Sequence, residues 1–120
     1  MSGNFIMPQS DDRVLCVCIT TRIPRDWFLG NARIADEIIA RHGEMRLLVY
    51  YKNYQGWDED ATREDSSAFI NQGSYFRKFA YVNPPEKTLL RQKMRLSFFS
   101  GELRVFKEEE LEEAVKWVKE

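Results

Sequence analysis

The sequence predicts an α/β fold with a mostly parallel sheet of four to five strands and about four packed helices. Short apolar runs of strand length alternate regularly with longer segments whose apolar residues recur at helical spacing. Each helical segment is long enough for the crossover that joins two parallel strands. The chain has 120 residues, of which 43% are hydrophobic, which suits one domain with its own core. We therefore expect residues 1–120 to form a single domain.

The first half of the chain is predicted to contain two core strands and a helix. Residues 14–20 are apolar on both alternating faces, which is typical of a central strand that is covered on two sides. Apolar residues at helical spacing predict a helix at residues 26–42, which ends before Gly43. Residues 46–51 form an apolar run too short for a helix and are predicted as the second core strand. Residues 4–7 are compatible with a short edge strand that could support a homodimer.

The second half repeats this alternation. An acidic turn, which suits the positive end of a helix dipole, precedes a predicted helix at residues 59–72. Residues 78–82 are predicted as a third strand, and a proline-containing turn leads into a third helix at residues 86–97. Residues 102–106 alternate as a fourth strand. The final helix begins in the acidic run at 108–110 and carries an apolar stripe of Leu111, Ala114, Val115 and Val118.

Charge and hydropathy exclude several functional classes. The 18 Lys and Arg residues are opposed by 19 Asp and Glu residues, and the net charge of −1 gives no overall positive field for nucleic acid. No apolar run approaches the ~18–20 residues of a membrane span, and the N-terminal segment does not resemble a signal peptide. We therefore expect a cytoplasmic protein that does not bind nucleic acid.

The two cysteines, Cys16 and Cys18, occupy one predicted strand and face the same side. Their nearly parallel Cβ vectors disfavour a disulfide between them. As a metal site, this Cys-x-Cys pair would need further soft ligands, and His42 is the only imidazole of the chain. We interpret the cysteines as small core residues and His42 as a helix-end residue, and we predict no metal site and no cofactor.

The sequence contains no motif that joins a nucleophile to its base. A Gly-x-Ser-x-Gly elbow, a phosphate-binding loop, a Gly-x-Gly-x-x-Gly fingerprint and a His-Glu-x-x-His motif are all absent. We therefore predict no enzyme activity and no catalytic residue.

Candidate binding residues lie in the loops that follow the predicted strands. Ligands of parallel sheets gather beyond the carboxyl ends of the strands, where we expect a protein partner or a small ligand to bind. Trp57 is either a recognition side chain or a cap that packs the following helix onto the sheet, and Asp58 suits a helix N-cap better than a general base. The candidates at this edge are Thr21, Arg22, Lys52, Asn53, Tyr54, Trp57, Asp58 and Asn83.

A second hypothesis is a peripheral membrane protein or a carrier of a hydrophobic ligand such as a lipid. The predicted helix at residues 86–97 combines a basic face with an aromatic pair that follows it, a pattern found in helices that lie on membranes. A solvated basic face, with both aromatic rings in the core, explains the same pattern and is favoured. The residues concerned are Lys87, Arg91, Arg95, Phe98 and Phe99.

Several segments carry a resemblance to a known family. They are HGEMRLLV at 42–49, GWD at 56–58, RKFAYV at 77–82, LRVF at 103–106 and ELEEAVKW at 110–117. Over roughly residues 14–118 the chain resembles the SpoIIAA-like family of small bacterial proteins, which shares the STAS fold of the anti-sigma-factor antagonists. The resemblance implies a four- or five-stranded sheet wound with its helices, and it implies no enzyme activity.

One departure concerns phosphorylation. In the phosphorylatable antagonists, a serine motif lies in the turn after the strand that corresponds to residues 46–51, and GWD at 56–58 occupies that turn here. Ser66 and Ser67 follow Asp65 inside a predicted helix, so the phosphosite is not transferred to them. A phosphate there would also meet neighbouring carboxylates. A phosphorylation-regulated antagonist is therefore the least favoured alternative.

Overall fold

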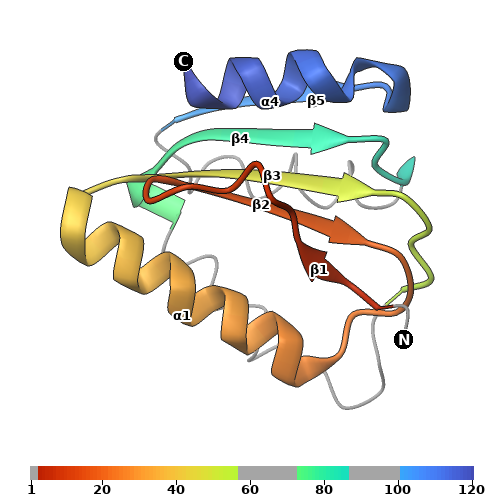
Figure 1. Cartoon of the computed structure of the whole chain (residues 1–120), viewed down its shortest axis with the longest axis horizontal. Helices are drawn as coiled ribbons and strands as arrows, with labels where there is room; N and C mark the ends of the chain where they lie inside the picture. The colour runs from red at the N-terminus through yellow and green to blue at the C-terminus, as the bar shows by residue number, and fades with distance from the viewer. Residues whose placement is uncertain (1–2, 57–72, 87–100) are drawn as a thin grey trace.

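Five strands form one sheet in the order β1-β2-β3-β4-β5 in the computed structural model, which describes residues 3–56, 73–86 and 101–120 (Figure 1). Strands β2 to β5 run parallel, and β1 pairs antiparallel with β2. The sheet confirms the predicted mostly parallel α/β fold. The strands are β1 (Phe5–Ile6), β2 (Val14–Ile19), β3 (Met45–Tyr51), β4 (Phe76–Val82) and β5 (Glu102–Phe106).

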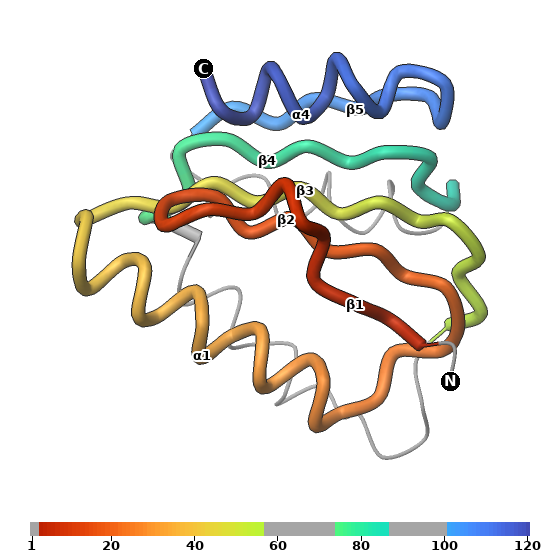
Figure 2. Tube along the Cα trace, viewed as in Figure 1, coloured from red at the N-terminus to blue at the C-terminus, as the bar shows by residue number. Residues whose placement is uncertain are grey.

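The two described helices, α1 (Arg25–His42) and α4 (Leu111–Lys119), cover opposite faces of the sheet (Figure 2). Helix α1 ends as the sequence predicts, because Gly43 adopts a left-handed φ of 77° and its N–H donates to the Ile39 carbonyl at 2.7 Å. Short 3-10 turns, η1 (Gly73–Tyr75) and η3 (Glu108–Glu110), precede β4 and α4. The helices expected at 59–72 and 86–97 lie outside the described residues.

The core has one apolar layer on each face of the sheet. Every residue of β2 is buried, because its alternate side chains enter the two layers. Leu15, Val17 and Ile19 face α1, whereas Cys16 and Cys18 lie in the layer covered by α4. This two-sided burial explains why the segment is apolar throughout and confirms the prediction of a strand covered on both faces, although β3 rather than β2 is the central strand of the sheet.

Two strands begin earlier than expected, whereas β2 ends one residue early at Ile19 and the edge strand is shortened to Phe5–Ile6. Strand β4 begins at Phe76 rather than at residue 78, and β3 begins at Met45 rather than at residue 46. Met45 pairs with Phe76 next to a register shift, and both side chains are buried. Arg77 and Lys78 interrupt the apolar pattern after Phe76. The sequence pattern therefore did not indicate that Met45 and Phe76 belong to the two strands. Among the described residues, no helix is both long enough and apolar enough to cross a bilayer.

Candidate functional site

The loops after β2, β3 and β4 meet at one edge of the sheet, because parallel strands share the edge at which they end. The first two are the β2 loop, residues 20–24, and the β3 loop, residues 52–56. The residue Asn83 follows β4 at the same edge. The structure therefore brings together most of the candidate residues that the sequence predicted. Trp57 and Asp58, which were predicted here as well, lie outside the described residues.

The Asn4 side chain fixes the β2 loop from the N-terminal side. Its Oδ1 accepts hydrogen bonds from the N–H groups of Thr20 at 2.8 Å and Thr21 at 3.3 Å. Its Nδ2 donates to the Arg22 carbonyl at 2.9 Å. The Thr20 hydroxyl also donates to the Gly3 carbonyl at 2.7 Å. Sequence reasoning missed Asn4, because a contact that spans 16 residues leaves no local signal.

Backbone hydrogen bonds join the β2 loop to the β3 loop. The Ile23 N–H donates to the Gly56 carbonyl at 2.8 Å, and the Gln55 N–H donates to the Thr21 carbonyl at 3.4 Å. The Arg22 guanidinium reaches the Gln55 carbonyl at 3.5 Å. The two loops therefore form a single ordered rim.

The remaining bonds tie this rim to the sheet. The N–H groups of Lys52 and Asn53 both donate to the Ile19 carbonyl at 3.0 Å. Tyr54 is half-buried against the core, and its ring meets that of Tyr51 edge-on with the centroids 5.5 Å apart. The predicted candidate Tyr54 thus serves at least partly in packing.

Asn83 holds the ends of three strands together. Its N–H donates to the Phe106 carbonyl at 2.8 Å, and its Nδ2 donates to the Tyr51 carbonyl at 2.9 Å. Its φ is 56°, a left-handed value that asparagine tolerates better than most residues. The amide nitrogen of this predicted binding residue is therefore engaged within the fold.

The exposed part of the rim is polar and cationic. Arg22, Lys52, Asn53 and Gln55 are exposed, and Thr21 is half-buried. Gln55 was missed by the sequence reasoning, although it lies between two predicted candidates. Arg22 and Lys52 place a guanidinium and an ammonium on adjacent loops, which suits recognition of an acidic group.

A strong hydrogen bond lies close by, on the face covered by α4. The Tyr50 hydroxyl donates to Glu108 Oε1 at 2.6 Å and links β3 to η3. Burial, followed by the effect of the Glu108 carboxylate, raises the pKa of Tyr50 to about 12. This phenol therefore holds its proton at neutral pH and acts as a donor.

The two cysteines are free and buried, as the sequence predicts. Burial raises the pKa of the Cys16 thiol to about 11 against the opposing effect of Lys119, and it also raises the pKa of Cys18. Neither thiol is activated as a nucleophile. Within residues 3–56, 73–86 and 101–120, no group of three His, Cys, Asp or Glu side chains could hold a metal ion.

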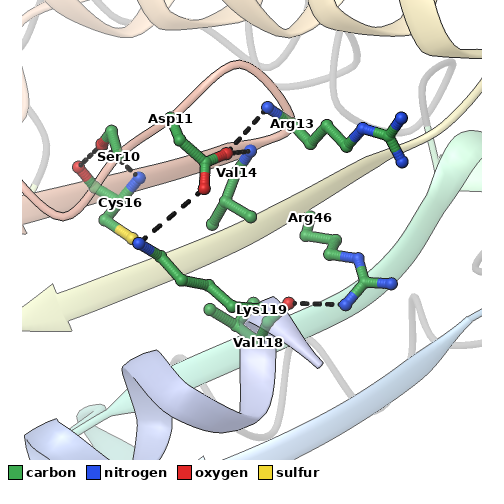
Figure 3. Close-up of polar contacts among 8 residues, drawn as sticks. All are labelled: Ser10, Asp11, Arg13, Val14, Cys16, Arg46, Val118 and Lys119. Carbon is green, nitrogen blue, oxygen red and sulfur yellow. Dashed lines mark hydrogen bonds and ion pairs between the residues drawn. The ribbon is translucent and has the colours of Figure 1, made fainter.

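A second polar cluster lies at the opposite edge of the sheet (Figure 3). Asp11 Oδ1 accepts from the N–H groups of Arg13 and Val14 at 2.9 Å, and Asp11 Oδ2 lies 3.7 Å from Lys119 Nζ. Arg46 Nη1 donates to the Val118 carbonyl at 3.0 Å. These contacts fix the start of β2 and the end of α4, so we assign them a role in stability.

His42 lies in the last turn of α1, which confirms its interpretation as a helix-end residue. Its Nε2 is 3.5 Å from Asp12 Oδ2. The remaining candidates fall outside the described residues. They are the phosphosite alternatives Ser66 and Ser67 and the membrane or lipid alternatives Lys87, Arg91, Arg95, Phe98 and Phe99.

Comparison with known proteins agrees with this architecture. The SpoIIAA-like family model matches residues 19–119, which is most of the chain. The sheet, the helices that cover it and the match to the family model together define an α/β domain of the SpoIIAA-like class. The chain belongs to the SpoIIAA-like family, and the resemblance seen in its sequence motifs is confirmed.

One solved structure shows the same fold. It is the crystal structure of an uncharacterised protein from Shewanella loihica PV-4, described as a DUF3478 family protein with a SpoIIAA-like fold. The TM-score is 0.67 at 19% sequence identity, and the match covers 97% of this chain and 93% of that chain. At this identity the likeness concerns the fold alone. No curated protein matches the chain.

Proposed function

We propose that this protein is a non-enzymatic binding module that holds a protein partner or a small ligand on the rim formed by the β2 and β3 loops. The observation that carries the proposal is the ordered backbone beneath exposed polar side chains. Asn4 and the bonds between the two loops fix the rim, while Arg22, Lys52 and Asn53 remain exposed. A preorganised site loses less conformational freedom when it binds.

Charge favours an acidic ligand group. Arg22 and Lys52 lie on adjacent loops, and a carboxylate or phosphate between them would gain charge-assisted hydrogen bonds from both. Asp26, in the first turn of α1, contributes an opposing charge at the start of that helix. The bound group is therefore expected to lie toward the β3 loop, over Lys52 and Asn53.

The chemistry of the described side chains supports binding rather than catalysis. The Cys16 and Cys18 thiols are buried, with pKa values above the ordinary range, and so lack thiolate character. The Tyr50 phenol is held as a donor to Glu108. None of these three groups has the lowered pKa of an activated nucleophile.

NMR titration of the full chain tests the proposal. Addition of an acetylated tetraglutamate peptide, or of inorganic phosphate in a parallel arm, is expected to shift backbone amide signals of residues 20–24 and 52–56. The double variant Arg22→Ala with Lys52→Ala is expected to lose these shifts. The peptide and phosphate arms distinguish an acidic protein segment from a small anion.

A charge-matched control separates the rim from net charge. The double variant Arg41→Ala with Arg77→Ala removes the same charge from two exposed positions on α1 and β4. It is expected to bind like the wild type. Equal losses in both double variants, or shifts spread over the whole chain, would contradict a site at the rim.

A further inference from the structure

Three sulfur-containing side chains lie on one face of the sheet. Cys16 and Cys18 alternate along β2 and therefore project toward the α4 side. In the antiparallel register, Phe5 pairs with Cys18 and Ile6 with Val17, so Met7 comes opposite Cys16. The Met7 N–H donates to the Cys16 carbonyl at 2.8 Å, which fixes this placement. Residues directly opposite each other in an antiparallel pair share a face, with Cβ atoms about 4.5–5.5 Å apart.

These three side chains are buried in one layer of the core. Met7, Cys16 and Cys18 are 6%, 0% and 1% exposed and belong to the same buried cluster. Beside this cluster, the Ser10 hydroxyl and the charges of Lys119 and Asp11 act on Cys16. The soft donors that share the buried layer are the three sulfur atoms.

We propose that the Sγ atoms of Cys16 and Cys18 and the Sδ atom of Met7 form a binding site for Cu(I). A Cys-x-Cys pair alone needs a further soft ligand, and the pairing of β1 with β2 supplies the Met7 thioether. Thiolate and thioether donors select soft ions such as Cu(I). Structural zinc takes four ligands, usually including further cysteine or histidine; the chain has no third cysteine, and its one histidine, His42, lies at the end of α1.

Charged groups beside the cluster act on both thiols. Two thiolates and one Cu(I) carry a net charge of −1, and the two thiol protons pass to solvent as the ion binds. Lys119 acts electrostatically on Cys16, beside which it lies in Figure 3, and Lys52 acts on Cys18. Asp11, whose carboxylate lies 3.7 Å from the Lys119 ammonium, opposes the effect of Lys119 on Cys16, whereas Lys52 favours the thiolate of Cys18.

The N-terminal segment offers a route for the ion. Strand β1 contains only two residues, and a short edge strand of this kind opens at less cost than the interior of the sheet. Separation of β1 from β2 would withdraw Met7 from Cys16 and return it on closing.

Anaerobic titration of the reduced full chain with Cu(I), in competition with the chromophoric chelator bicinchoninate, tests the proposal. We expect the protein to remove one equivalent of Cu(I) from the chelator and to develop near-ultraviolet thiolate-to-Cu(I) absorption. Cys16→Ser and Cys18→Ser are each expected to abolish this competition. Far-ultraviolet circular dichroism of each variant establishes that the sheet is retained.

Two methionine variants provide a matched control. Met7→Leu removes the proposed ligand, whereas Met45→Leu removes a buried methionine from the layer facing α1. Met7→Leu is expected to weaken Cu(I) binding by at least roughly 10–100-fold, because loss of even an outer-shell partner of a metal ligand lowers metal affinity by that factor. Met45→Leu is expected to leave the affinity for Cu(I) unchanged. Equal affinities of the two variants, or tight binding that persists without either cysteine, would overturn the proposal.

Discussion

Single side chains decide how the rim is ordered, and Asn4 is the clearest case. Replacement by alanine removes the acceptor of the Thr20 and Thr21 N–H groups and the donor to the Arg22 carbonyl. We expect Asn4→Ala to lower the free energy of unfolding by about 1–3 kcal/mol, because half-buried donors lose their partner. Urea denaturation measures the change.

Asn53→Ala is the matched control for this experiment. Asn53 is an exposed residue of the same rim, and within the described part of the chain it is held by its backbone N–H bond to the Ile19 carbonyl. Its replacement is expected to change the free energy of unfolding by less than about 0.5 kcal/mol, as is usual for surface positions. Equal effects of the two variants would show that the Asn4 amide does not order the loop.

The Tyr50 phenol predicts a loss of stability at alkaline pH. Its pKa is raised to about 12 in the folded chain, from 10.0 as the ordinary value. The folded state therefore binds this proton more tightly than the unfolded state, so the contribution is complete below pH 10 and declines as the pH rises toward 12. The urea concentration at the unfolding midpoint should decrease between pH 9 and pH 11, and this decrease should be larger in the wild type than in Tyr50→Phe.

The raised Cys16 pKa contributes to alkaline destabilisation in both proteins, so the comparison isolates Tyr50. At neutral pH, Tyr50→Phe also loses the bond to Glu108, which we expect to cost about 1–2 kcal/mol. A pH dependence identical to that of the wild type would contradict this account of the phenol.

At the scale of elements, the glycine inside α1 and the glycine that follows its last residue are expected to respond in opposite directions. Gly43 ends the helix with φ at 77°, and an alanine there should cost about 1 kcal/mol of stability. Gly30 lies inside the helix, and a Cβ there meets no atom within 4 Å in the described part of the chain. Gly30→Ala is expected to stabilise the protein by roughly 0.5–1 kcal/mol. Thermal unfolding monitored by circular dichroism measures both, and changes of the same sign would contradict the assigned helix end.

The sequence predicted those elements whose pattern is local. Strand β2 was evident because it is buried on both faces, and α1 was evident from its apolar spacing and from Gly43. The pairing of β1 with β2 depends on contacts between segments that are distant in sequence, and so does the bond from Tyr50 to Glu108, 58 residues apart. The rule that ligands gather at strand ends placed Arg22, Lys52 and Asn83 at this edge, but it could not indicate Asn4, which reaches the edge from the residue before the antiparallel strand β1.

At the scale of the whole molecule, a rim-binding module and a peripheral membrane protein make different predictions. If binding occurs at the rim, the full chain should not float with vesicles of phosphatidylcholine and phosphatidylglycerol at low salt. Low salt is the most sensitive condition, because screening weakens attraction between a basic face and anionic lipid. Flotation that disappears at high salt would favour the alternative based on Lys87, Arg91 and Arg95.

The amide of Asn83 joins the ends of three strands, and its durability follows from the next residue. Spontaneous deamidation begins when the backbone nitrogen of the following residue attacks the side-chain amide. That residue is Pro84, whose ring nitrogen carries no hydrogen, so the usual cyclic intermediate does not form. The bond to the Tyr51 carbonyl is thereby protected from chemical ageing, and long-lived copies of the protein should keep this corner intact.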